Sequence, residues 1–162
     1  MTTPPRHHPS ERAIAIRYQQ LSAEVKALQR QCYALATLRL RAAVDASGTG
    51  KGLAVVSDID ETILDNTAVM AHAMTLGEHL DGFETWKLWE REGSPHLLPG
   101  AAEFISELAR CGRRFLVLTN NSMFTPRDLR ARLARAGIDL EEDALWTSAL
   151  ATARFLSEQS PG

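Results

Sequence analysis

Four acidic residues close an apolar stretch near the middle of the chain. The run "LAVVSDID" (residues 53–60) has the composition of a buried strand. Its end and the residues just after it carry four acidic side chains within eight positions, Asp58, Asp60, Glu61 and Asp65. Side chains two apart in an extended chain point the same way, so Asp58 and Asp60 are expected to face one small volume. Both carboxylates are ionised at neutral pH, since their ordinary pKa is about 4. They therefore repel each other unless a cation compensates them.

A magnesium ion is the cation that this pattern favours. Mg²⁺ prefers oxygen ligands and commonly takes one or two carboxylates together with water and a substrate phosphate. One carboxylate can attack phosphorus and form an aspartyl-phosphate. A second carboxyl, two residues further on, can protonate the leaving oxygen and later activate water. The sequence therefore predicts an Mg²⁺-dependent phosphoryl-transfer site at Asp58 and Asp60, with an acid-rich turn or helix cap as the alternative.

The elements that must position these carboxylates alternate between strands and helices. Such an order predicts an α/β fold, in which a parallel sheet carries helices on its faces. Functional sites in these sheets lie beyond the carboxyl ends of the strands. Both the acidic cluster and the polar "TNN" at 119–121 fall there. The expected strands are 53–60, 114–121 and 143–148, and the expected helices are 67–80, 97–112, 125–137 and 149–159.

The N-terminal part is predicted to be separate from this core. Residues 1–10 are expected to be a disordered lead-in, 11–50 an amphipathic helix with a linker, and 51–162 the α/β core. The helical pattern over 11–45 places apolar residues alternately four and three apart, on one helix face. That stripe fits docking on the chain's own core, which we favour, or a helical dimer. The stripe consists of Ile14, Tyr18, Leu21, Val25, Leu28, Cys32 and Leu35.

Composition excludes several kinds of partner. The formal net charge of −2 argues against a broad basic face for nucleic acid. No apolar run has the length of a membrane span, which predicts no membrane partner. The first residues contain no apolar signal segment, so a cytoplasmic location is expected.

Two short motifs carry a family resemblance. "DIDET" (residues 58–62) and "LTNN" (residues 118–121) resemble the first two motifs of the haloacid dehalogenase (HAD) phosphatases. The resemblance implies a Rossmann-like HAD fold and a small phosphomonoester substrate. It assigns Asp58 as the nucleophile and Asp60 as the acid and base. Mg²⁺ would be held by the Asp58 carboxylate and the Asp60 backbone carbonyl, and phosphate by Thr119 and the Asn120 amide.

The resemblance divides near Gly112. Residues 18–112 resemble the class C (lipoprotein-type) acid phosphatases, and 115–156 resemble the NagD-type branch. These branches carry different caps, so a chimeric or truncated sequence is expected. The family's later Lys or Arg and its later acidic pair are not found. The main hypothesis is an acid phosphatase or nucleotidase-like hydrolase, and the alternative is a catalytically incomplete HAD fragment that serves as a binding or interaction module.

A small helical cap is expected at about 66–97. Within it Phe83, Trp86 and Trp89 are spaced for one helix face. They either pack the cap on the core or stack on a flat leaving group of the substrate. In the strand order of the HAD sheet, the strand at 53–60 lies in the centre. Only three strands are detected in this sequence, so this strand is expected to lie at the edge of the sheet. A homo-oligomer formed through this edge or through the N-terminal helix is therefore expected.

Overall fold

The computed structural model describes residues 9–47, 52–77 and 83–159 of the 162-residue chain. Most of the predicted lead-in and the middle of the predicted linker lie outside these ranges. The side chain of Phe83 is also outside the described part, although its backbone is included.

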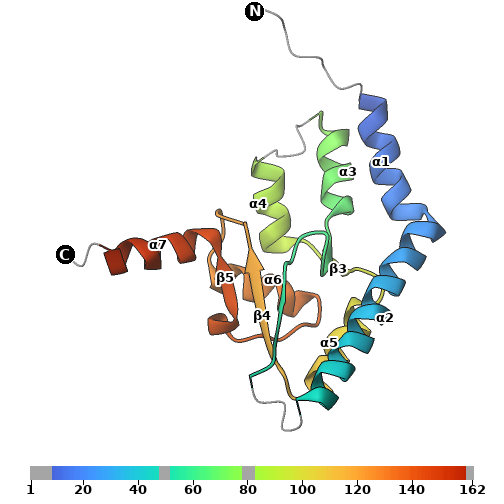
Figure 1. Cartoon of the computed structure of the whole chain (residues 1–162). Coiled ribbons are helices and arrows are strands. Elements are labelled where there is room, and N and C mark those ends of the chain that lie inside the picture. The colour runs from blue at the N-terminus through green and yellow to red at the C-terminus, as the bar shows by residue number, and fades with distance from the viewer. Residues whose placement is uncertain (1–8, 48–51, 78–82, 160–162) are drawn as a thin grey trace, which may run out of the picture.

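The centre of the molecule is a parallel sheet of three strands in the order β1-β4-β5 (Figure 1). They are β1 (Ala54–Ser57), β4 (Arg114–Thr119) and β5 (Leu145–Thr147). Both pairings are parallel, so the three carboxyl ends lie along one edge of the sheet. The predicted α/β fold with three parallel strands is confirmed.

The two faces of this sheet differ sharply in burial. Phe115, Val117 and Leu145 point to one face and are buried in the core. Val56 and Leu118 belong to the other face and are 53% and 51% exposed. Strand residues alternate between faces, so the sheet buries one face of these strands and leaves side chains of the other face half exposed.

Two helices cover the buried face. They are α5 (Ala101–Arg110) and α6 (Pro126–Arg135), whose apolar side chains join the strands in the core. Helix α6 begins at a capping box, in which Thr125 and Asp128 satisfy each other's backbone N–H groups. A 3₁₀ turn (Glu142–Ala144) precedes β5. Helix α7 (Ser148–Gln159), which follows β5, has no buried residue and extends away from the sheet (Figure 1).

The N-terminal segment forms two helices instead of the predicted one. Helix α1 (Pro9–Leu21) ends where Ser22 leaves the helical conformation and accepts a hydrogen bond from the Val25 N–H at 3.3 Å. This serine is the N-cap of α2 (Ala23–Ala46), so the prediction of one continuous helix is wrong.

Helix α2 docks on α5, but not through the predicted stripe. Its contacts with the core come from Tyr33, Ala36, Leu40 and Val44. The predicted stripe is mostly in solvent, where Ile14, Tyr18, Leu21, Leu28 and Leu35 are each at least half exposed. Apolar spacing predicted the helical conformation of this segment but neither its break at Ser22 nor the face that packs on the core.

A short ladder closes the predicted cap insertion. Strand β2 (Leu64–Asp65) pairs antiparallel with β3 (His96–Leu97), which brings the two ends of 66–97 together. Between them lie α3 (Thr67–Thr75), which contacts α1, and α4 (Phe83–Glu92), which contacts α6. None of the described helices combines the length and the apolar character needed to cross a membrane.

Candidate functional site

Three of the predicted site residues line one cavity at the carboxyl ends of the strands. Asp58 directly follows β1, and Thr119 ends β4 and precedes Asn120. The cavity has a volume of about 410 Å³. Within the described part of the chain, the Asp58 carboxylate receives no hydrogen bond and is exposed, so it is available to a cation or an electrophile. The lining also includes Leu118, Trp146, Thr147, Ser148 and Ala151.

The loop after β4 is fixed by its own side chains. The Thr119 hydroxyl accepts a hydrogen bond from the Asn121 N–H at 3.1 Å, and the Asn121 side chain accepts from the N–H groups of Met123 and Phe124. The Ser148 hydroxyl donates to the Asn120 carbonyl at 3.0 Å. These bonds hold the Asn120 backbone next to Thr119, where an amide and a hydroxyl can bind one anion together.

A tight turn follows Asp58. The Ile59 carbonyl accepts hydrogen bonds from the N–H groups of Ile63 at 2.8 Å and Leu64 at 3.0 Å. Ile59 and Ile63 are buried in the core and anchor the turn. Glu61 adopts a left-handed conformation with φ 53°, which is uncommon outside glycine. Partial burial, followed by the neighbouring Asp60 charge, raises the pKa of Glu61 above its ordinary value.

The Asp60 carboxylate binds an arginine that the sequence analysis missed. Its Oδ1 accepts hydrogen bonds from Arg132 Nη1 at 3.0 Å and from Asn66 Nδ2 at 2.9 Å. Arg132 comes from α6, is fully buried, and also donates from Nη2 to Asn66 Oδ1. The signal was present in the sequence, because Arg132 occupies the apolar face of α6 between Leu129 and Leu133. An arginine in such a position needs a buried partner.

Asn66 lies at the N-cap of α3, but its side chain makes no capping bond. Asp65 caps the helix instead, because its Oδ1 accepts hydrogen bonds from the Thr67 N–H at 2.8 Å and from the Thr67 hydroxyl at 2.6 Å. The Asn66 side chain is therefore turned inward, where it is fully buried against Asp60 and Arg132.

Helix α2 also touches the turn after Asp58. The Tyr33 hydroxyl donates a hydrogen bond to the Thr62 carbonyl, and its ring packs against Phe104 with centroids 5.7 Å apart. Burial raises the pKa of Tyr33 above its ordinary value, so the hydroxyl stays protonated and remains a donor. The N-terminal segment thus supports the turn that carries the acidic residues.

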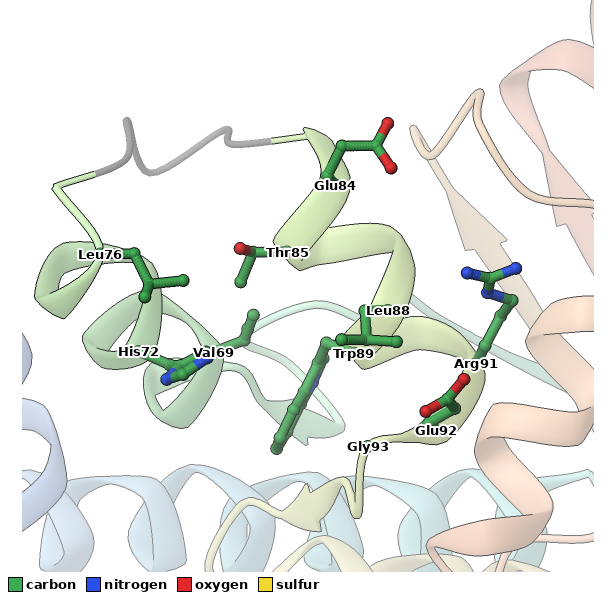
Figure 2. Close-up of a pocket in the computed structure, with 10 residues that line it drawn as sticks. All are labelled: Val69, His72, Leu76, Glu84, Thr85, Leu88, Trp89, Arg91, Glu92 and Gly93. Atoms are coloured by element: carbon green, nitrogen blue, oxygen red, sulfur yellow. The ribbon is translucent and has the colours of Figure 1, made fainter.

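The cap aromatics do not share a wall with Asp58. Trp89 lines a separate cavity of about 590 Å³, whose walls come from α3 and α4. Figure 2 shows Val69, His72 and Leu76 on the α3 side of this cavity, while the Glu84 and Arg91 head groups point away from the Trp89 ring.

Neither cavity lining includes Trp86. The aromatic residue that lines the Asp58 cavity is instead Trp146, over whose ring the Arg154 guanidinium lies 4.4 Å from the centroid. Nothing in the sequence analysis pointed to this tryptophan.

A metal site would have few protein ligands. Among the described residues no three His, Cys, Asp or Glu side chains gather as a metal cluster, and no Lys or Arg lines the Asp58 cavity. Of the described residues that line the cavity, Asp58 is the one that brings a carboxylate. Such a sparse set suits Mg²⁺, which keeps several waters and a substrate phosphate in its shell.

The fold and the residues at the strand ends can be compared with those of known proteins. Residues 88–162 match a family model described as haloacid dehalogenase-like hydrolase. The whole fold resembles the class C acid phosphatase from Bacillus anthracis, with a TM-score of 0.78 and 26% identity over 93% of this chain and 65% of that one. The predicted HAD-like fold is confirmed.

The relatives found by sequence belong to the NagD-type branch, which residues 115–156 were predicted to resemble. The chain is 52% identical over 63 residues to the dihydroxyacetone phosphatase of Corynebacterium glutamicum, covering 39% of this chain and 23% of the relative. It is 44% identical over 62 residues to the ribonucleotide monophosphatase NagD of Escherichia coli, covering 38% and 25%. The chain thus spans about a quarter of these relatives. The predicted resemblance to both class C and NagD-type HAD phosphatases is confirmed.

Proposed function

We propose that the chain carries the nucleophile-bearing part of an Mg²⁺-dependent phosphomonoesterase that acts through an aspartyl-phosphate on Asp58. The observation that carries this proposal is the single cavity shared by Asp58, Thr119 and Asn120. The relatives support it, since they are named as phosphatases of a triose phosphate and of ribonucleotide monophosphates. Both are small phosphate monoesters.

The chemistry uses the residues in two steps. The Asp58 carboxylate attacks phosphorus, the bond to the ester oxygen breaks, and Asp60 gives its proton to the leaving oxygen. Asp60 then takes a proton from water, which attacks phosphorus, releases inorganic phosphate and restores Asp58. The Thr119 hydroxyl and the Asn120 N–H bind the non-bridging oxygens. Mg²⁺, held by the Asp58 carboxylate and the Asp60 carbonyl, would neutralise the charge that builds up on phosphate.

The test is hydrolysis of p-nitrophenyl phosphate by the purified chain, with Mg²⁺ and with EDTA. We expect turnover only with Mg²⁺ and none from Asp58→Asn, because the amide is nearly isosteric but cannot attack phosphorus. Asp139→Asn is the matched control, since Asp139 is exposed and lies at the other end of β5. Wild-type activity in Asp58→Asn would contradict the assignment of Asp58 as the nucleophile.

A binding or interaction module is the second candidate, and the absence of Lys and Arg from the described lining of the Asp58 cavity favours it. Losing one preorganised charge typically reduces kcat about a hundredfold or more. We therefore expect a kcat for this chain below about 1 per second, the lower end of the usual range. Calorimetric binding of inorganic phosphate with Mg²⁺, without any hydrolysis, would favour the module over the enzyme.

A further inference from the structure

We propose that Arg132 and Asn66 are positioning residues that hold the Asp60 carboxylate for proton transfer. The inference deepens the proposed function and rests on it, since it concerns the same phosphatase reaction. None of Asp60, Asn66 and Arg132 is among the residues that line the Asp58 cavity, and the Asp60 side chain is 22% exposed. Arg132 and Asn66 are therefore assigned no direct contact with substrate, and they act only through the Asp60 carboxylate.

The hydrogen bonds on Asp60 fall on one oxygen alone. Arg132 Nη1 at 3.0 Å and Asn66 Nδ2 at 2.9 Å both donate to Oδ1. No donor within the described residues reaches Oδ2 of Asp60. An anchored Oδ1 fixes the rotation of the carboxylate, and an unbonded Oδ2 is then the oxygen that can carry and release a proton. A general acid needs both properties, a fixed direction and one open oxygen.

The anchor is rigid because its members also bind each other. Arg132 Nη2 donates to Asn66 Oδ1, which closes a triangle of Asp60, Asn66 and Arg132. Arg132 and Asn66 are both fully buried, and α6 holds the arginine between Leu129 and Leu133. The planar guanidinium serves two acceptors at once from fixed positions, which a lysine ammonium cannot reproduce.

Stability alone does not account for this buried arginine. Replacing a buried ion pair by apolar residues of similar volume is often neutral or stabilising, since desolvation offsets the attraction between the charges. The neighbours on the same helix face, Leu129 and Leu133, show that apolar side chains fit there. A role in orienting Asp60 explains why the apolar face of α6 carries a charge at this one position.

The first experiment compares leaving groups. A departing 2,4-dinitrophenolate needs little protonation, whereas an alkoxide from glycerol 1-phosphate depends on a well-placed acid. In Arg132→Lys and Asn66→Ala we expect kcat/KM with Mg²⁺ to fall about tenfold or more for glycerol 1-phosphate and at most about twofold for 2,4-dinitrophenyl phosphate. Equal losses for both substrates would overturn the proposal. Arg130→Lys, an exposed arginine of α6, is the matched control and should change neither value.

The second experiment needs no activity. At fixed pH, three-bond NMR couplings of Asp60 should report one χ1 rotamer in the wild type and averaged rotamers in Asn66→Ala. A melting curve by circular dichroism shows that the variant is folded, and Asn66→Ala leaves the Asp65 cap of α3 intact. An averaged wild-type rotamer, or an unchanged one in the variant, would overturn the positioning role. A wild type that hydrolyses neither substrate would instead overturn the proposed function, with the rotamer result still deciding how Asp60 is held.

Discussion

At the scale of single residues, Asp58 and Asp60 of the acidic cluster have different surroundings. The sequence suggested one compensating cation for Asp58 and Asp60, a bound Mg²⁺. The structure pairs Asp60 with the buried Arg132 and leaves the Asp58 carboxylate exposed in its cavity. Two neighbouring carboxylates with different surroundings are suited to different roles, one as a nucleophile and one as an acid and base. The sequence predicted the pair, but the distinct surroundings depend on a helix seventy-two positions away from Asp60.

Trp146 offers a prediction at the same scale. We expect Trp146→Ala to weaken the binding of nucleoside monophosphates about fivefold and to leave glycerol phosphate unchanged, because stacking on an aromatic ring contributes about 1 kcal/mol or more. A competition titration measures this preference. Trp86→Ala and Trp89→Ala test the earlier expectation that the cap aromatics stack on the substrate. If they change the preference while Trp146→Ala does not, the cap contacts the substrate and Trp146 does not.

At the scale of elements, an acidic side chain joins α2 to α5. Glu107 accepts hydrogen bonds from Arg110 Nη2 at 2.7 Å and from Arg41 Nε at 2.6 Å. Arg110 first, and then Arg41, lower the pKa of Glu107 to about 2. Its folded-state pKa is thus below its unfolded value of about 4.3. The stabilisation is complete above that unfolded value and is lost as pH falls toward about 2.

Glu107→Gln should therefore lower the melting temperature at pH 7, with the difference from wild type shrinking as the pH falls below about 4. Thermal melts in low salt at several pH values measure this difference. Glu103→Gln, an exposed acid on the same helix, is the control. A wild-type advantage that does not change between pH 7 and pH 3 would show that Glu107 acts through packing and not through its charge.

The approach of α2 to the start of α5 gives another prediction. Gly100 has φ 95°, and an added Cβ would lie 2.9 Å from Tyr33 Cβ. Gly77 has φ 70°, and no atom of the described residues lies within 4 Å of such a Cβ. Gly77→Ala should cost about 1 kcal/mol of unfolding free energy from backbone strain alone. Gly100→Ala should cost at least about 1 kcal/mol more through the clash. Urea unfolding measures both, and equal losses would mean that Tyr33 moves away freely.

Local pattern predicted the order of elements well, and tertiary contacts explain where it failed. The helix expected over 125–137 and the strand before Asp58 are local signals, and both were predicted from sequence. The break at Ser22 was missed because the apolar periodicity continues across it. Periodicity does not show that Ser22 ends one helix and caps the next. Arg132 was missed because its partner Asp60 is distant in sequence, although its place on an apolar helix face marked it.

At the scale of the whole molecule, the described helices cover one side of the sheet and leave side chains of the other side exposed. Helices α5 and α6 bury the face that carries Phe115 and Val117, while Val56 and Leu118 on the opposite face are about half exposed. Strand β1 also has a single strand neighbour among the described elements, β4, so one of its edges is unpaired. An apolar strand edge without charged side chains pairs readily with another chain.

We therefore expect the purified chain to associate at micromolar concentrations, as dimers or larger species in size-exclusion chromatography with light scattering. Val56→Lys should shift the population toward monomer, because a charge at the edge strand opposes pairing and costs little where the side chain is already exposed. Leu76→Lys, equally exposed but on the cap, is the matched control. Leu28→Lys tests the other route, the exposed stripe of the N-terminal helices. Dissociation by Leu28→Lys alone would assign the interface to α2, and a monomeric wild type would contradict self-association by either surface.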